Sequence, residues 1–167
     1  MKQKVHLNRM HIATKSGKID ISLEVKTAEL AKKFSFILKK GDIVFLYGEI
    51  GVGKTTFIRN LINNFQKKKN LNLTEITSPT FNIVNEYEIK DLTIQHYDLF
   101  RLKDESELKN IGLLENTNVF LTFVEWPEII TKKNINTIDL IFEYGENIEK
   151  RFLTIKGLNK EQLDAIR

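Results

Sequence analysis

The chain has 167 residues, of which 41% are apolar, a formal net charge of +4 and no cysteine. This length supports one ordinary hydrophobic core, so the sequence predicts a single domain over residues 1–167, with 1–17 as an N-terminal extension of uncertain order. The lack of cysteine excludes disulfides, thiolate metal sites and cysteine nucleophiles. Because neither a signal peptide nor an apolar run of membrane-spanning length is found, we expect a soluble cytoplasmic protein with no membrane partner.

The basic excess gives little support to nucleic-acid binding, because it consists of lysines scattered along the chain. The densest run is Lys67-Lys68-Lys69. It follows a predicted helix and is flanked by asparagines, which favours a solvated loop over a phosphate-binding patch.

The first half of the chain alternates between strand and helix patterns. Apolar and polar residues alternate over 18–25, which predicts a half-buried strand, and Thr27 is the expected cap of a helix that ends at Gly41. The unbroken apolar run within 42–47 is typical of a central parallel strand, and helical spacing of apolar residues predicts a helix over about 54–65.

The second half of the chain is richer in strand patterns. Residues 81–89 and 92–99 read as antiparallel strands joined by a turn at Lys90-Asp91, and a short helix is expected over 104–109. Further strands are expected over 119–124, 137–142 and 151–155, with a turn at Gly145 and a terminal helix from Leu158.

A glycine-rich loop lies between the predicted strand 42–47 and the predicted helix 54–65. Its sequence, Gly48-Glu49-Ile50-Gly51-Val52-Gly53-Lys54-Thr55, has the spacing of a P-loop, or Walker A motif. Such a loop points backbone N–H groups at phosphates, while its lysine adds a mobile charge and its threonine a hydroxyl for Mg²⁺. An ordinary glycine turn beside a helix is the competing explanation, but a chance match is expected only about once in a few hundred chains of this length.

The motif and its flanks predict an α/β fold, a single P-loop NTPase-like domain with a mixed, mostly parallel central sheet flanked by helices. The expected ligands are ATP and Mg²⁺. GTP is disfavoured because no Asn-Lys-x-Asp tetrad is present, and phosphotransfer to a small molecule is disfavoured because few arginines are available to clamp the phosphoryl group. The predicted nucleotide contacts within the loop are Gly48, Gly51, Val52, Gly53, Lys54, Thr55 and Thr56.

Two carboxylates are candidates for the metal and water site, because each follows a predicted apolar strand. Asp98 follows 92–97 and Glu125 follows 119–124, and a carboxylate at such a strand end can hold magnesium or polarise the attacking water. The sequence does not divide these roles, and a surface acid at a strand end is the alternative for either residue. The predicted catalytic residues are Lys54, Asp98 and Glu125, and the predicted metal ligands are Thr55, Asp98 and Glu125.

Four further motifs follow the loop in a characteristic order. They are Ser78-Pro79-Thr80-Phe81, His96-Tyr97-Asp98-Leu99-Phe100-Arg101-Leu102, Ile111-Gly112-Leu113 and Glu125-Trp126-Pro127-Glu128. With the P-loop they resemble the bacterial TsaE family, also called YjeE, over roughly residues 24–151. The resemblance implies an accessory ATPase needed to form the threonylcarbamoyl group on adenosine 37 of tRNAs that read codons beginning with adenine. It further implies docking on a heterodimer of TsaD and TsaB, so that tRNA is met indirectly through the complex.

The resemblance also implies roles for individual residues. It places Lys54 and Thr55 on phosphate and magnesium, Thr80 in a switch-like segment near the γ-phosphate, and Asp98 with Glu125 in the metal and water site. Trp126 would lie beside that site unless it is a core aromatic, and His96 is more simply a packed or surface histidine. Positions that approach the nucleotide in the family correspond loosely to Glu24 and Arg151. The alternative function is a nucleotide-dependent switch with little hydrolysis, and a small-molecule kinase is a third possibility.

Overall fold

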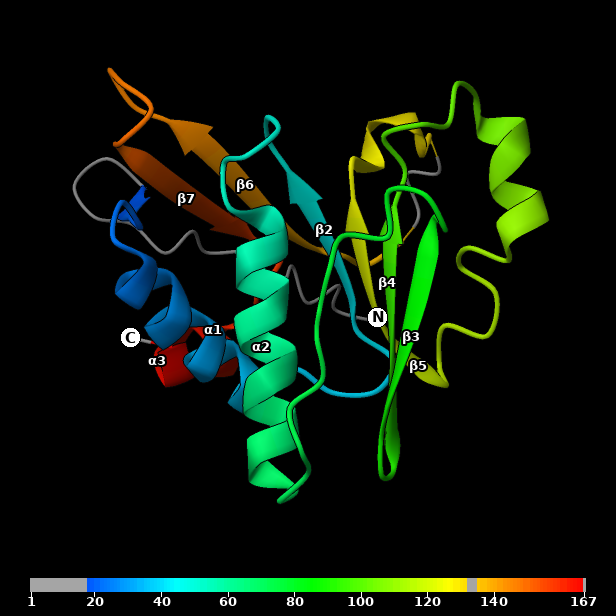
Figure 1. Cartoon of the computed structure of the whole chain (residues 1–167), viewed down its shortest axis with the longest axis horizontal. Helices are drawn as coiled ribbons and strands as arrows, with labels where there is room; N and C mark the ends of the chain where they lie inside the picture. Colours follow the sequence, from blue (N-terminus) through cyan, green and yellow to red (C-terminus); the bar gives the residue numbers. More distant parts are fainter. Residues whose placement is uncertain (1–17, 132–134, 167) are drawn as a thin grey trace, which may run out of the picture.

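One seven-stranded sheet runs through the computed structural model, which describes residues 18–131 and 135–166 (Figure 1). The predicted extension 1–17 lies outside the described residues. The strand order is β1-β7-β6-β2-β5-β4-β3. The strands are β1 (Ile19–Asp20), β2 (Ile43–Tyr47), β3 (Val84–Ile89), β4 (Leu92–Asp98), β5 (Phe120–Glu125), β6 (Ile138–Tyr144) and β7 (Arg151–Lys156). The helices are α1 (Glu24–Ile37), α2 (Lys54–Lys68) and α3 (Lys160–Ile166), with 3₁₀ helices η1 (Glu105–Ile111) and η2 (Pro127–Ile129).

The centre of the sheet is parallel and its margins are antiparallel. Strands β6, β2, β5 and β4 run in one direction, while β3 pairs antiparallel with β4, and β7 pairs antiparallel with both β6 and β1. The predicted mixed α/β fold with a parallel centre is therefore confirmed. Because parallel strands end at the same edge, the segments that follow β2, β4 and β5 meet there. The register places Glu125 beside both Leu46 and Asp98.

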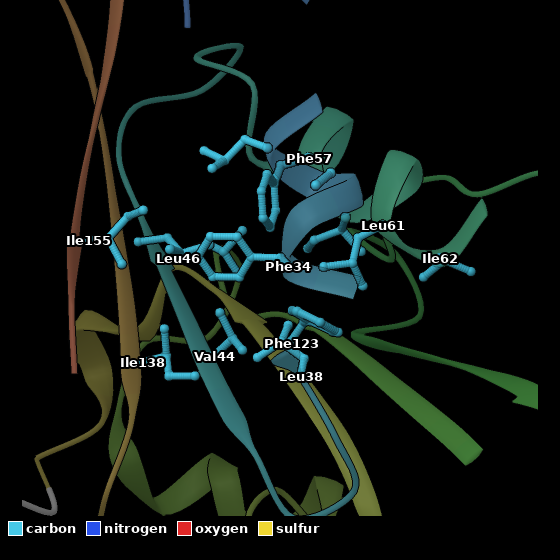
Figure 2. Packing of buried hydrophobic residues seen from close by; sticks show 14 of the residues in the cluster. Phe34, Leu38, Val44, Leu46, Phe57, Leu61, Ile62, Phe123, Ile138 and Ile155 are labelled. Atoms are coloured by element: carbon cyan, nitrogen blue, oxygen red, sulfur yellow. The ribbon is translucent and has the colours of Figure 1, made fainter. Parts of the chain in front are cut away.

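Helices α1, α2 and α3 pack on one face of the sheet, and the larger of the two hydrophobic clusters lies beneath them (Figure 1). In this cluster Phe34 of α1 meets Phe57 of α2 edge to face, with ring centroids 5.4 Å apart. Figure 2 shows both rings beside Leu46 and Val44 of the central strand. Burying such a side chain contributes about 1.5–3 kcal/mol, so this contact anchors the helix that follows the glycine-rich loop.

The opposite face of the sheet carries a smaller apolar cluster. It is built from Phe45 and Tyr97 of the sheet and is covered by Leu108 of η1 and by Leu113. Asp104 caps η1 by accepting a hydrogen bond from the backbone N–H of Ser106, within a capping box. The helix predicted over 104–109 is thus present, as a 3₁₀ helix.

The expectations for the first strand and helix were partly wrong. The strand predicted over 18–25 is only two residues long, because the Asp20 side chain accepts a hydrogen bond from the Ser22 N–H and turns the chain out of the sheet. Helix α1 begins at Glu24, so Thr27 is a buried residue of its first turn and not its cap. The helix ends at Ile37, and Gly41, with φ +96°, instead forms the turn into β2.

Two further expectations need correction. The strand predicted over 81–89 begins only at Val84, because Ile83 has φ +68° and its N–H bonds back to the carbonyl of Pro79. The lysine run is not a free loop, since α2 continues to Lys68, whose Nζ donates to the carbonyl of Ser35. The next residue, Lys69, forms an ion pair with Asp91. The hairpin at Lys90-Asp91 and the remaining strands and terminal helix agree with expectation to within a few residues.

In the part of the chain that the structure describes, no helix combines the length and apolar character required to cross a bilayer.

Candidate functional site

The loop between β2 and α2 requires glycine at two positions for different reasons. Gly48 has φ +133°, and a Cβ there would lie 2.4 Å from the carbonyl oxygen of Phe142 in the neighbouring strand. Gly53 has φ +119° and stands at the N-cap position of α2, with open space around it. Glycine at Gly48 permits close backbone packing, and at Gly53 it permits a conformation that side chains disfavour. The loop therefore leads directly into the positive end of α2.

Lys54, the first residue of α2, turns its side chain back over the loop. Its Nζ donates to the carbonyls of Gly48 at 2.6 Å and Glu49 at 3.0 Å and lies 4.1 Å from the ring centroid of Trp126. The residue is 4% exposed, and burial lowers the pKa of its amine, opposed in part by the charge of Glu125 and more weakly by that of Asp98. A buried cation held by carbonyls and a ring suits the approach of an anion.

Glu125 ends β5 and is 3% exposed. Its Oε1 accepts a hydrogen bond of 2.8 Å from the hydroxyl of Thr55 and lies 2.9 Å from Nε2 of His96. A threonine that donates its hydrogen to a carboxylate keeps its oxygen lone pairs for another partner. The hydrogen bond between Thr55 and Glu125 thus connects the start of α2 with the end of β5.

Asp98 is the last residue of β4 and is hydrogen-bonded to the segment that precedes β3. Its Oδ2 accepts hydrogen bonds from the hydroxyls of Ser78, at 2.6 Å, and Thr80, at 2.9 Å. Its Oδ1 accepts one from the N–H of Phe100, at 3.0 Å. The carboxylate therefore links the Ser78–Thr80 segment to the sheet edge that also carries Glu125.

These groups surround a cavity of about 240 Å³. The predicted site residues that line it are Gly51, Gly53, Lys54, Thr55, Thr56, Thr80, Asp98 and Glu125. The other lining residues are Ile50, Ser78, Phe100 and Trp126. Residues from four separate segments thus converge at the carboxyl edge of the parallel strands.

Four predicted site residues lie outside the lining of this cavity. Gly48 and Val52 belong to the loop itself, where Val52 is buried in the main core. Glu24 is the exposed first residue of α1, and Arg151 is the first residue of β7, paired with Tyr144 at the end of β6. Because the hydroxyl of Tyr144 donates to the carbonyl of Ile50, the strand ends that carry Arg151 lie next to the loop.

The donor set fits magnesium carried in with a triphosphate better than a resident metal ion. Within the described residues, no group of three or more His, Cys, Asp or Glu side chains is arranged to hold a metal. The cavity instead has two carboxylates in its lining, Asp98 and Glu125, and the hydroxyl of Thr55 is hydrogen-bonded to the second of them. Mg²⁺ keeps several waters and is usually bound through one or two carboxylates together with substrate phosphates.

Four contacts in the site were not foreseen from the residue pattern. Ser78 shares Asp98 with Thr80, and the ring of Trp126 contacts both Lys54 and Phe100. His96 is packed, as expected, but its Nε2 points at Glu125. Residues two apart in a strand lie on the same face, so His96 shares a face with Asp98. Since Asp98 is in register with Glu125 of β5, this pattern would place the His96 ring near Glu125.

The fold and the loop define a protein of the P-loop class. A sequence profile described as "Threonylcarbamoyl adenosine biosynthesis protein TsaE" matches residues 21–152. The chain therefore belongs to the TsaE family, which functions in tRNA threonylcarbamoyladenosine biosynthesis.

Relatives named "tRNA threonylcarbamoyladenosine biosynthesis protein TsaE" match across most of the chain. The Rickettsia conorii protein is 42% identical over 143 residues, which cover 84% of this chain and 78% of that protein. The Haemophilus influenzae protein is 34% identical over 146 residues, covering 81% and 89%. The crystal structure of Bacillus subtilis YdiB has the same fold, with a TM-score of 0.67 at 20% identity, over 94% of this chain and 92% of that chain.

Proposed function

We propose that this chain binds ATP with Mg²⁺ and hydrolyses it as an accessory subunit for forming the threonylcarbamoyl group on adenosine 37 of tRNA. In this proposal it acts in the cytoplasm with the TsaD–TsaB heterodimer and meets tRNA only through that complex. The observation that carries the proposal is the convergence of Lys54, Thr55 and Glu125 around one cavity at the end of the P-loop.

In the proposed site, phosphates lie against the loop and the N-terminus of α2. Backbone N–H groups of the loop and of the first turn of α2 would face them, and Lys54 would leave the carbonyls of Gly48 and Glu49 to pair with phosphate oxygens. This exchange replaces two neutral acceptors with a charged one, which strengthens the hydrogen bonds of the buried amine.

Magnesium bound with ATP would supply positive charge that offsets the negative charge of the phosphates. Thr55 offers its hydroxyl oxygen to the metal and keeps donating its hydrogen bond to Glu125. Asp98 and Glu125 hold ordered water near the γ-phosphate, and one of them accepts a proton from the attacking water. Asp98 and Glu125 thus share two tasks, holding water and accepting its proton.

We also place Glu24 and Arg151 at the edge of the nucleotide site, beyond the phosphate cavity. The Nε atom of Arg151 is buried and has no hydrogen-bond partner among the described residues. An unpaired buried donor is costly, so a ligand acceptor at this position would stabilise the bound state.

A nucleotide-dependent switch with little hydrolysis is a second candidate, and one observation favours it. Asp98 accepts hydrogen bonds from both Ser78 and Thr80, and the backbone of Ile83 just beyond them is in the left-handed region, which a β-branched residue disfavours. Phosphate oxygens that accept hydrogen bonds from Ser78 and Thr80 in place of Asp98 would release this segment and change the surface around it.

The test is ATP hydrolysis by the purified chain with Mg²⁺, alone and after addition of the TsaD–TsaB heterodimer. The accessory-ATPase proposal expects slow turnover alone and faster turnover with the heterodimer. Unchanged turnover, combined with heterodimer binding that is equally tight with ATP and with a non-hydrolysable analogue, would support the switch instead.

A further inference from the structure

His96 is the one buried histidine in the described part of the chain, and it lies directly beneath the proposed site. It belongs to β4, is 0% exposed, and pairs in register with Phe123 of β5. Its Nε2 reaches Oε1 of Glu125, two residues further along β5, at 2.9 Å. The ring contributes nothing to the lining of the cavity, so any action on the reaction passes through Glu125.

The position of the ring proton follows from the hydrogen bonds around it. Nδ1 is buried and has no partner among the described residues. A buried N–H without an acceptor is rarer and more costly than a ring nitrogen that simply lacks a donor. A hydrogen is therefore assigned to Nε2, which donates it to the carboxylate of Glu125.

Two donors therefore converge on the same oxygen of Glu125. Thr55 donates to Oε1 from α2, and His96 donates to it from β4. Among the described residues no hydrogen bond is made to Oε2. The pair of donors fixes the rotation of the carboxylate and leaves Oε2 as the oxygen with free acceptor capacity.

We propose that His96 is a positioning residue for Glu125, which uses its Nε2–H to hold Oε1 so that Oε2 is presented to water or metal in the ATP site. This inference rests on the proposed function, because it concerns the carboxylate that the ATPase would use. It predicts that the hydrogen bond, more than the shape of the ring, is what turnover requires.

The test compares His96→Gln with His96→Met in the full-length chain. The two side chains have the same length, but methionine is an unbranched thioether and only glutamine can donate a hydrogen bond to Glu125. We expect His96→Met to lower kcat for ATP about tenfold or more with KM changed less than about threefold, and His96→Gln to keep kcat within about threefold of the unsubstituted chain. Equal losses in the two variants, or wild-type turnover in His96→Met, would overturn the proposal.

A double-mutant cycle supplies a second kinetic readout. In a Glu125→Gln background, His96→Met should cause no further fall in kcat, because the residue acts only through that carboxylate. A further tenfold fall would overturn the proposal. Gln95→Met is the matched control, since Gln95 is the neighbour on the other face of β4, bonded to Glu86, and its loss should leave kcat unchanged.

Urea unfolding separates this inference from the proposed function. If the unsubstituted chain hydrolyses no ATP, the proposed function fails, but the contact between His96 and Glu125 is still measurable. We expect the double variant, His96→Met combined with Glu125→Gln, to lower the unfolding midpoint by less than the sum of the shifts in the two single variants. Shifts that simply add would contradict a contact between the two residues. If His96→Met does not fold, His96→Leu, which also lacks a hydrogen-bond donor, takes its place.

Discussion

The hydroxyl of Thr55 donates a hydrogen bond of 2.8 Å to Oε1 of Glu125, which lies 70 residues further along the chain. This contact joins the first turn of α2 to the end of β5 and brings together two of the groups that we propose for magnesium binding. The loop, the helix and the sheet edge are thus held in one arrangement, which reduces the reorganisation needed on binding.

Thr55 is best tested with a pair of substitutions of similar size. Thr55→Ser keeps the hydroxyl, whereas Thr55→Val keeps the shape and removes the hydroxyl. We expect Thr55→Val to need about tenfold more Mg²⁺ for half-maximal ATP hydrolysis, and Thr55→Ser to stay within about threefold of the unsubstituted chain. Titration of hydrolysis with Mg²⁺ at fixed ATP measures the difference. An identical requirement in the two variants would remove Thr55 from the metal site.

The two carboxylates should affect turnover more than nucleotide binding. Glu125→Ala and Asp98→Ala remove groups that we propose to act on metal and water, while Lys54 and the loop, which we propose to hold the phosphates, stay intact. We expect kcat to fall about a hundredfold or more and the Kd for ATP to change by less than about tenfold, measured by steady-state kinetics and calorimetry. Glu128→Ala is a control on the same segment. Wild-type hydrolysis by Glu125→Ala would show that the metal assignment is wrong.

Trp126 should report nucleotide binding by its fluorescence. It is the only tryptophan in the chain, and its ring lies 4.1 Å from Nζ of Lys54 and 4.9 Å from the ring of Phe100. When phosphates draw the lysine away, the surroundings of the indole change, so its emission should shift on addition of ATP. Lys54→Ala should abolish both the shift and tight binding in calorimetry, whereas Lys67→Ala, an exposed lysine of the same helix, should preserve both.

Gly48 and Gly41 both have a positive φ, but only Gly48 is also closely packed, so comparing them measures the effect of packing. Gly48→Ala places a Cβ 2.4 Å from a carbonyl oxygen, so we expect a loss of about 3 kcal/mol or more in unfolding free energy, together with loss of ATP binding. Gly41→Ala has open space around it and a φ of +96°, so it should cost only about 1–2 kcal/mol and leave ATP binding intact. Urea unfolding measures both, and equal losses would contradict the packing explanation.

Stability at alkaline pH should depend on Tyr97. Burial, with smaller contributions from Glu86 and Glu115, raises the pKa of its phenol to about 12 from the ordinary value of 10.0. Because the unfolded chain ionises first, the stability associated with the neutral phenol is complete below pH 10 and is lost as the pH rises from 10 to about 12. The loss is on the order of 2 kcal/mol.

Tyr97→Phe should flatten this alkaline decline, since phenylalanine has no proton to lose. Unfolding midpoints measured at several values between pH 9 and 12 would show the change, while Tyr87→Phe, a partly exposed tyrosine of β3, should have a smaller effect. An unchanged slope for Tyr97→Phe would contradict the role assigned to burial.

The convergence of the site could be predicted from the sequence because it follows from strand direction. Asp98 and Glu125 each end a strand, and parallel neighbours end at one edge, so their meeting required only the correct assignment of β4 and β5. The loop could also be predicted from the sequence, since Gly48, Gly51 and Gly53 occur at the spacing typical of a P-loop.

The details that escaped prediction depend on single side-chain contacts. Asp20 ends β1 after two residues by bonding to Ser22, and neither residue breaks the alternating pattern from which a longer strand was expected. The direction of the His96 ring depends on which buried partner satisfies it, and periodicity carries no such information. The left-handed backbone of Ile83 is held by the Pro79 carbonyl, although isoleucine itself favours an extended strand.

The proposed function is tested most sharply by repeated formation of threonylcarbamoyladenosine on tRNA by the TsaD–TsaB heterodimer, with ATP, Mg²⁺ and this chain. We expect many modified tRNAs per heterodimer with the unsubstituted chain, and a yield near that of the heterodimer alone with Lys54→Ala or Glu125→Ala. Full yield with the Glu125→Ala chain, once its loss of hydrolysis has been verified, would show that ATP hydrolysis at this site is not what the modification requires.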